Sequence, residues 1–446
     1  MCHAIGMSFS SEAGEIDSLI GSYRRITMPR DKTIGLSVAE IKSAARDMAR
    51  PRRESMNAGE RRASMTLASI YGLRMLGLFL ILPVFAIYAR TLPGGNNHAT
   101  VGLALGIYGL TQAALQIPFG LASDHWGRKP VIITWLTIFA LGSFFAGLAH
   151  TLPLIIVGRA VQGAGAISAA ISAMIADATR EQHRTKAMAM VGLMIGASFI
   201  ISLAAGPLLY RSIGVPGMFL LTGVLATAAI FVVKFIVPDV PIAAAAPAAS
   251  SQAAPGVITP ALIRLHFSIF ALNFMQVALF LVVPLALVDN AGIALQDHWL
   301  VYLPVALGGF VIAIPGIIWA EKYGYMRQAF LAAVMLLTLA MLAFAAGYRH
   351  EVVLIAGLFV FFIAFNLLEA LLPSLVSRTA PPSRKGLAMG VYNTAQSLGL
   401  FAGGAVSGVA AQYGGSAAVF LVCAAIGLSW VAVAAFIQPP PKREAH

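Results

Sequence analysis

From residue 65 onward the chain is a succession of apolar stretches of about 20 residues, separated by short polar segments. A helix of that length crosses the roughly 30 Å hydrocarbon layer of a bilayer. Backbone groups in lipid must be paired within their own segment, so such stretches form helices. The composition agrees, because 59% of the 446 residues are hydrophobic and only 11% are charged. The sequence therefore predicts a polytopic membrane protein and excludes a soluble enzyme, a secreted disulfide scaffold and a disordered chain.

We predict twelve membrane-spanning helices, and their ranges are 65–89, 99–121, 131–149, 152–175, 186–209, 216–237, 261–287, 299–320, 328–347, 352–376, 386–411 and 416–437. One longer break, rich in Ala, Pro and Ser, divides them into two sets of six. The predicted domains are a cytoplasmic tail (1–64), an N-terminal six-helix bundle (65–237), a cytoplasmic linker (238–260), a C-terminal six-helix bundle (261–437) and a short cytoplasmic tail (438–446).

The two halves repeat weakly. Asp124-His-Trp-Gly127 follows the second span, and Glu321-Lys-Tyr-Gly324 follows the eighth. Lys186-Ala-Met-Ala-Met190 and Lys385-Gly-Leu-Ala-Met389 enter the fifth and eleventh spans. The predicted fold class is an all-α membrane protein with two pseudo-symmetric six-helix bundles, a layout common in secondary transporters.

Lys and Arg are distributed very unevenly between the two sides of the predicted membrane. If the N-terminus is cytoplasmic, 25 of the 30 lie on the inner side and three, Arg90, Arg211 and Arg349, lie outside. Positive loops stay cytoplasmic, so we expect both termini inside and a multi-pass protein of the inner or plasma membrane. The net charge of +12 then follows from topology and gives no reason to expect nucleic acid as a partner.

The first 64 residues hold eleven Lys and Arg, eight Asp and Glu, and no long apolar run. They therefore lack the apolar core of a signal peptide. We expect a mostly disordered cytoplasmic tail, with a membrane-surface helix at 37–50 as the alternative.

Three charged residues lie deep within the predicted spans: Arg74, Arg159 and Glu369. A charge at the bilayer centre costs at least about 2.5 kcal/mol, so such residues usually face the protein interior and have a function. Our hypothesis is that Glu369 is the protonation site and that Arg74, at similar depth in the other half, tunes its pKa. The alternative is a permanent structural ion pair. For Arg159 we predict a role in substrate or proton handling, with hydrogen bonding between helices as the alternative.

Further polar residues recur at helical spacing in the spans and are candidate cavity lining. Each is equally compatible with a hydrogen bond between helices. They are Tyr108, Gln112, Gln116, Gln162, Asn273, Gln276, Asn366, Asn393 and Gln396.

Gly120-Leu-Ala-Ser-Asp124-His-Trp-Gly127-Arg128-Lys129 resembles the loop 2–3 signature of the major facilitator superfamily, with His125 in place of the usual Arg. The resemblance implies the twelve-helix fold, with helices 1, 4, 7 and 10 around a central cavity. It also implies a conformational latch of Gly120, Asp124, Gly127, Arg128, Lys129 and Asp177. In this latch Asp124 is held against the N-terminus of helix 11, where the helix dipole favours an anion. The alternative is a solvated ion pair of little energy.

A second stretch, Arg159-Ala-Val-Gln162-Gly163-Ala-Gly165-Ala166, resembles the helix 4 motif of the superfamily. Gly206-Pro207 resembles part of its antiporter motif, although Ser202 and Tyr210 stand where that motif has glycines.

Over about residues 56–438 the chain resembles the YajR-type branch of the drug:proton antiporters. The stretches that carry the resemblance are Gly59-Glu-Arg-Arg-Ala63, Leu73-Arg-Met-Leu-Gly77, Gly106-Ile-Tyr-Gly-Leu-Thr-Gln112, Thr179-Arg-Glu-Gln182 and Ala364-Phe-Asn-Leu-Leu-Glu-Ala-Leu-Leu-Pro-Ser374. Members of this branch tend to start near Met56, so we expect residues 1–55 to be either an extension or the product of a misplaced start codon.

The predicted function is secondary active transport, with proton entry driving export of a small amphipathic or drug-like solute by alternating access. No phosphate-binding G-x-x-x-x-G-K-[ST] motif is present, so the energy must come from a gradient. The alternative within transport is uptake or exchange of a small organic anion through a cationic cavity.

An enzyme is not expected, because H-E-x-x-H, G-x-S-x-G and paired intramembrane carboxylates are all missing from the sequence. A sensor derived from the same fold is a further alternative. We expect no cofactor or metal, a monomer, and the solute, protons and the bilayer as partners.

Overall fold

The computed structural model describes residues 56–165, 168–237, 259–381 and 384–437, except for six helical side chains, those of residues 124, 169, 176, 181, 182 and 185. The predicted tail up to residue 55, most of the predicted linker and residues 438–446 lie outside these ranges. Within them the regular structure is helical, without a strand.

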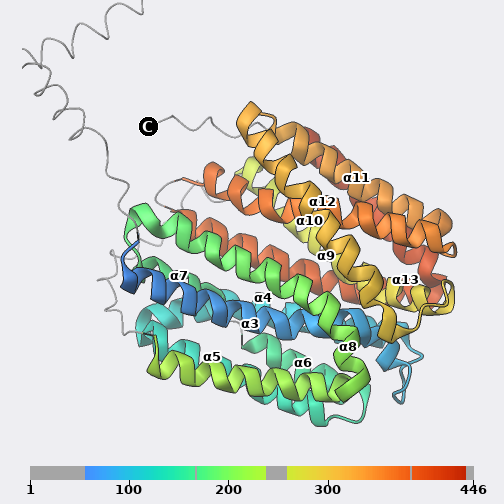
Figure 1. Cartoon of the computed structure of the whole chain (residues 1–446), viewed down its shortest axis with the longest axis horizontal. Coiled ribbons are helices and arrows are strands. Elements are labelled where there is room, and N and C mark those ends of the chain that lie inside the picture. The colour runs from blue at the N-terminus through green and yellow to red at the C-terminus, as the bar shows by residue number, and fades with distance from the viewer. Residues whose placement is uncertain (1–55, 166–167, 238–258, 382–383, 438–446) are drawn as a thin grey trace, which may run out of the picture. The chain divides into compact units, whose positions relative to one another are not determined.

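The helices follow the predicted spans closely (Figure 1). We call the first six the N bundle: α3 (Ala58–Ala89), α4 (His98–Trp126), α5 (Arg128–Leu148), α6 (Leu152–Ala164), α7 (Ser168–Ala178) and α8 (Glu181–Phe235). The rest form the C bundle: α9 (Pro260–Asp289), the short η1 (Leu295–Asp297), α10 (Trp299–Tyr323), α11 (Met326–Gly347), α12 (Glu351–Thr379) and α13 (Lys385–Ala435). Nine helices in the described residues are long and apolar enough to cross a membrane.

Two of these helices, α8 and α13, are far longer than one membrane crossing, and each is divided by a glycine. Gly214 has φ 63° and ψ 177°, and Gly415 has φ 67° and ψ −166°. Side chains disfavour this positive-φ backbone, so glycine is the residue that allows the change of direction. The predicted spans 186–209 and 216–237 lie on the two arms of α8, and 386–411 and 416–437 lie on those of α13. The predicted span 152–175 falls across α6 and α7, which are separated at Gly165.

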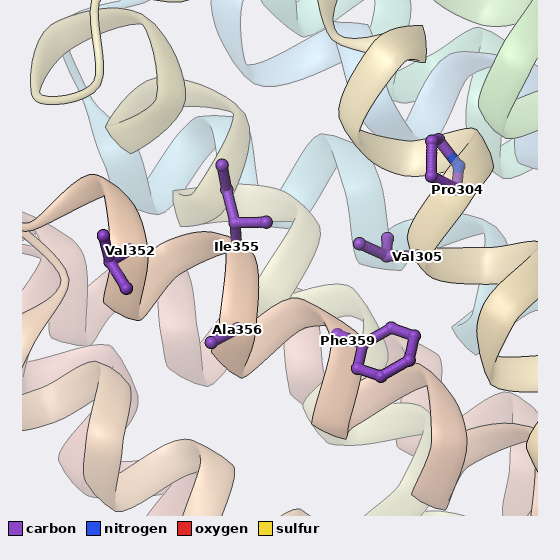
Figure 2. A pocket seen from close by; sticks show the side chains of 6 residues that line it. All are labelled: Pro304, Val305, Val352, Ile355, Ala356 and Phe359. Atoms are coloured by element: carbon purple, nitrogen blue, oxygen red, sulfur yellow. The ribbon is translucent and has the colours of Figure 1, made fainter.

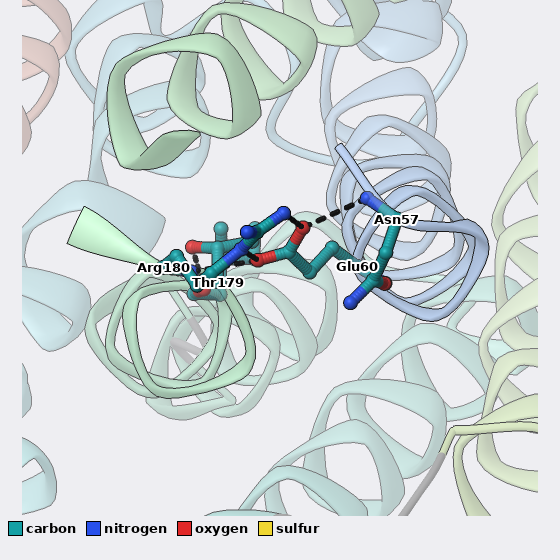
Figure 3. A network of polar contacts seen from close by, with 5 residues as sticks. Asn57, Glu60, Thr179 and Arg180 are labelled. Atoms are coloured by element: carbon teal, nitrogen blue, oxygen red, sulfur yellow. Dashed lines mark hydrogen bonds and ion pairs between the residues drawn. The ribbon is translucent and has the colours of Figure 1, made fainter. Parts of the chain in front are cut away.

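Helix α3 begins at Ala58, seven residues before the predicted start of the first span. The reason is a capping box, in which the Asn57 side chain accepts from the Glu60 N–H (2.7 Å) and the Glu60 carboxylate accepts from the Asn57 N–H (2.9 Å). The same carboxylate accepts from the backbone N–H and the guanidinium of Arg180 (Figure 3). Residues 58–64 are therefore helical rather than part of a disordered tail.

The helices have two ends, which we name by residues. The Arg90 end carries Arg90, His98, Asp289 and Gln412, and the Glu60 end carries Glu60, Arg128, Arg180, Glu321 and Arg378. At the Arg90 end the bundles are joined by the Arg90–Asp289 ion pair (2.6 Å) and by the His98 N–H, which donates to Gln412 Oε1 (2.7 Å). The hydrogen bond to Asp289 raises the pKa of Arg90, so the guanidinium group of Arg90 stays charged.

At the Glu60 end, by contrast, three ion pairs between described side chains each lie within a single bundle. They are Glu60–Arg180, Arg128–Asp177 and Glu321–Arg378. A methyl group placed on Gly192 of α8, or on Gly386 or Gly390 of α13, would meet no described atom within 4 Å. Among the described residues, the polar contacts between the bundles are therefore at the Arg90 end, and the described atoms leave open space around these three glycines toward the Glu60 end.

An aromatic cluster lies between the bundles. Phe199 of α8 packs against Phe280 of α9 and Phe362 and Phe365 of α12, with ring centroids 5.7–6.4 Å apart. Phe79 of α3 packs edge-on against the same ring at 5.0 Å. These centroid distances are within the range of favourable aromatic pairs. The five phenylalanines therefore form an apolar contact between the two bundles.

Candidate functional site

The polar interior of the N bundle centres on Tyr108. The Arg74 guanidinium donates to the Tyr108 hydroxyl and, at 3.3 Å, to Gln112 Oε1. Arg74 also lies over the Phe139 ring, with its guanidinium carbon 5.9 Å from the centroid. Arg74 is only 3% exposed, yet its Nε and one terminal nitrogen have no hydrogen-bond partner among the described residues. Tyr108 therefore holds Arg74 through a hydrogen bond and a cation–π contact.

Arg159 also lies over the ring of Tyr108, with its guanidinium carbon 5.3 Å from the ring centroid. It donates to the backbone carbonyls of Ala104 and Leu105 in α4 and to Gln162 Oε1, all at 3.3–3.4 Å. Gln162 in turn donates to Ser143 Oγ at 2.7 Å, which ties α6 to α5. These contacts are hydrogen bonds between helices, the interaction that was the predicted alternative for Arg159.

Glu369 lies on α12 in the C bundle. Its Oε1 accepts from Gln396 Nε2 of α13 at 3.3 Å, and its buried Oε2 has no hydrogen-bond partner among the described residues. One turn away, the buried Asn366 Nδ2 is also unpaired in the described structure. The predicted residues Glu369, Gln396 and Asn366 are therefore neighbours, and they include polar atoms available to a proton or a ligand.

Arg74 and Glu369 form no ion pair in the structure. Arg74 bonds to residues of α4, and Glu369 bonds to α13. Tyr71 of α3 is near enough to both Arg74 and Glu369 to interact with them electrostatically, and Tyr392 of α13 is near enough to both Glu369 and Tyr71. The permanent Arg74–Glu369 pair, which was the alternative to a protonation site, is not present.

Sequence reasoning missed Tyr71, Tyr392 and Ser143. A signal existed for Tyr71, because it precedes Arg74 by three residues and so shares its helix face. Tyr392 is likewise separated from Gln396 by one turn. No sequence signal marks Ser143, since its partner Gln162 lies on another helix.

The other predicted cavity residues are dispersed. Gln116 exchanges hydrogen bonds with Ser168 at 3.1 Å, inside the N bundle. Asn273 donates to the Ile269 carbonyl of its own helix, and Gln276 is buried nearby on α9. Asn393 is partly buried on α13. These four predicted residues therefore lie on α4, α9 and α13 and are not gathered at one site.

The predicted latch residues Gly120, Asp124, Gly127, Arg128 and Lys129 lie where α4 turns into α5, and Asp177 lies on α7. Gly127 has φ 95°, a conformation that requires glycine, and Gly120 lies one turn before Asp124 near the end of α4. Arg128 donates to Asp177 Oδ2 (3.1 Å) and to Ser123 Oγ (2.7 Å), and Lys129 donates to the Val237 carbonyl. The side chain of Asp124 is outside the described part. The Arg128–Asp177 contact joins α5 to α7 and is confined to the N bundle.

An apolar recess of about 460 Å³ lies elsewhere, between the Arg90-end halves of α10 and α12 (Figure 2). It is lined by Pro304, Val305, Val352, Ile355, Ala356 and Phe359. None of the predicted site residues borders it. Among the described residues there is also no cluster of side chains suited to a metal ion.

Comparison with known proteins identifies the fold. The sequence profile of the Major Facilitator Superfamily matches residues 67–404 and 265–446. The inner membrane transport protein YajR of Escherichia coli is 41% identical over 390 residues, which cover 86% of this chain and 85% of YajR. Multidrug resistance protein 2 of Bacillus subtilis is 25% identical over 345 residues, covering 75% of this chain and 85% of that protein. The crystal structure of the human organic anion transporter MFSD10 superimposes with a TM-score of 0.66 at 19% identity, covering 85% and 100% of the two chains.

These matches confirm the predicted resemblance and the all-helical fold class. YajR, which matches 86% of this chain, is an inner membrane transport protein, and nine described helices are long and apolar enough to cross a membrane. The comparison therefore also places this chain in a membrane as a multi-pass protein. The chain belongs to the Major Facilitator Superfamily and is a secondary transporter rather than an enzyme.

Proposed function

We propose that the protein is a proton-coupled antiporter that exports small amphipathic solutes by alternating access. The observation that carries this proposal is the Glu369 carboxyl group, which lies within a membrane helix with one oxygen buried and unpaired among the described residues. A carboxyl group in this position is costly unless it has a function. If it meets water from alternate sides, it exchanges its proton from alternate sides, which is what coupling requires.

The arrangement of charge bears on the solute. Both intramembrane arginines are held inside the N bundle, Arg159 by backbone carbonyls and Arg74 by Tyr108 and Gln112. The small void beside Arg74 has about 10 Å³ and is lined almost entirely by apolar side chains. Glu369, by contrast, has tyrosines and amides as neighbours rather than arginines. This arrangement favours neutral or cationic solutes over the organic anions of the alternative hypothesis.

We further propose that the Glu60 end faces the cytoplasm, as the Lys and Arg distribution predicts. The open space around Gly192, Gly386 and Gly390 in the described residues supports an opening toward the cytoplasm in this orientation. A multidrug resistance protein among the relatives agrees with an export role.

The experiment is pH-gradient-driven flux in proteoliposomes with cationic, neutral and anionic compounds. We expect Glu369→Gln to reduce driven flux to the level of protein-free liposomes, because an amide cannot exchange a proton. Exchange of labelled for unlabelled solute at equal pH should continue, which shows that the variant is folded and binds solute. Glu351→Gln is the matched control, since Glu351 is an exposed carboxylate in the first turn of the same helix.

Full pH-driven flux in Glu369→Gln would reject the proposal. Flux confined to anions, and lost in Arg74→Gln but not in Glu369→Gln, would favour the organic anion alternative.

A further inference from the structure

The apolar recess between α10 and α12 ends where the two helices pack closely (Figure 2). A methyl group on Gly308 of α10 would lie 2.7 Å from the Phe359 ring, and one on Gly309 would lie 3.0 Å from the Phe362 carbonyl carbon. The helices approach here because α10 has no side chain at these two positions. Phe359 belongs to this contact and also lines the recess, so its ring closes the recess toward the Glu60 end.

The recess opens onto the surface of the C bundle that faces lipid. Leu300, Leu307 and Val311 are exposed on α10. Together with the exposed Pro304 of the recess they recur at intervals of four, three and four residues, so they share one helix face. Val352, which lines the recess from α12, is 77% exposed. On a helix that crosses a membrane, an exposed apolar face of this kind contacts the lipid tails.

The size and chemistry of the recess fit an acyl chain. On α12 the lining runs from Val352 to Phe359, which is seven residues or about 10 Å along the helix. The volume of about 460 Å³ is comparable with that of small-molecule pockets, which hold about 300–1,000 Å³. All six lining side chains are apolar, so the recess offers no partner to a polar group. The occupant that suits it is therefore an elongated and wholly apolar one.

A cation lies where the recess reaches the start of α12. Arg349 is exposed and precedes Val352 by three residues. None of the ion pairs between described side chains includes it. Its Nε donates to the Tyr348 hydroxyl at 3.5 Å, and its guanidinium carbon lies 5.8 Å from the centroid of that ring. A guanidinium group binds phosphate through paired hydrogen bonds, so Arg349 supplies at this mouth the polar partner that the recess lacks.

We propose that the recess and Arg349 together bind one phospholipid of the surrounding bilayer, with an acyl chain along Val352, Ala356 and Phe359 and the phosphate group on Arg349. The lipid fills the gap that the Gly308 contact leaves between α10 and α12. Because it binds only the folded protein, it stabilises the Arg90-end halves of both helices. The proposal is independent of the transported solute and of the role of Glu369.

The test is lipid binding to the purified full chain in detergent, measured by native mass spectrometry. The two probes are dioleoylphosphatidylethanolamine and dioleoylglycerol, which have the same acyl chains, although only the first has a phosphate group. This phospholipid has no net charge, so Glu351, two residues beyond Arg349, does not repel it as it would an anionic lipid. We expect the parent protein to hold one phospholipid molecule about tenfold more tightly than dioleoylglycerol, since hydrogen bonds between charged groups have an effect of this size.

Two variants separate the phosphate site from the acyl chain site. Arg349→Gln should lower the affinity for the phospholipid to that for dioleoylglycerol and leave the binding of dioleoylglycerol unchanged. Ala356→Phe places a ring in the recess and should weaken the binding of both lipids by about tenfold, the effect of excluding two methylene groups.

Each variant has a matched control. Arg211→Gln removes another exposed arginine of the predicted outer side. Ala332→Phe adds the same ring at an exposed position of α11, which does not border the recess. Both control variants should keep the parent's affinity for each lipid.

Three results would overturn the proposal. They are an Ala356→Phe protein that binds both lipids like the parent, an Arg349→Gln protein that keeps the preference for the phospholipid, and an equal loss of binding in Ala356→Phe and Ala332→Phe. If Ala356→Phe does not fold, Ala356→Leu replaces it, because the smaller side chain still occupies the path of the acyl chain.

Discussion

At the scale of single residues, Arg159 shows how a buried charge is accommodated without an acidic partner. Its planar guanidinium donates to two carbonyls of α4 and to Gln162, and it stacks on Tyr108. A lysine has a single nitrogen and no fork, so it cannot reproduce this set. We expect Arg159→Lys to lower the free energy of unfolding by about 1–3 kcal/mol, the usual effect of leaving buried polar groups unpaired. Denaturant titration in detergent measures the change.

The matched control is Arg211→Lys, at an exposed position of α8. A surface exchange of this kind stays within about 0.5 kcal/mol. An Arg159→Lys variant as stable as this control would show that the hydrogen bonds of Arg159 contribute nothing to stability.

At the scale of elements, the start of α3 combines a helix cap with an ion pair. Glu60 is 6% exposed, whereas its partner Arg180 is 44% exposed. Caps are worth about 1 kcal/mol and exposed pairs less. We therefore expect Glu60→Ala to destabilise the protein by about 1–2 kcal/mol, and Glu60→Gln by less than half of that, because the amide oxygen still accepts from the Asn57 N–H. Thermal melting of the two variants separates the terms. Equal losses would mean that the charge, not the cap, holds this helix start.

At the scale of the whole molecule, the proposed orientation rests on the distribution of Lys and Arg. We expect Tyr413→Cys, 88% exposed at the Arg90 end, to react with an impermeant maleimide added to intact cells. Leu387→Cys, 55% exposed at the Glu60 end, should react only after the membrane is opened. The opposite pattern would contradict the positive-inside assignment. Gel shift of the labelled protein is the measurement.

The spans were predictable because each is a local property: about 20 apolar residues form a helix in lipid wherever they lie. Local signals also existed for features that the prediction missed. Asn57 and Glu60 match the pattern of a capping box, and the first helix could have been started there. The site was less predictable. Arg74 and Glu369 were expected to interact because of similar depth, but depth says nothing about the direction in which each helix turns its face.

The sequence alone determined that this chain is a multi-pass membrane protein, because apolar segments of spanning length are a property of the order of residues. Its motifs also resembled those of a transporter superfamily, and the comparisons confirmed that resemblance. Only the tertiary structure decided which polar groups meet. It turned Arg74 toward Tyr108 and Glu369 toward Gln396, and it set the glycines of α4 against those of α13. The physical reason is that contacts between helices depend on rotation and crossing, which arise from the packing of all of them together and from no single segment.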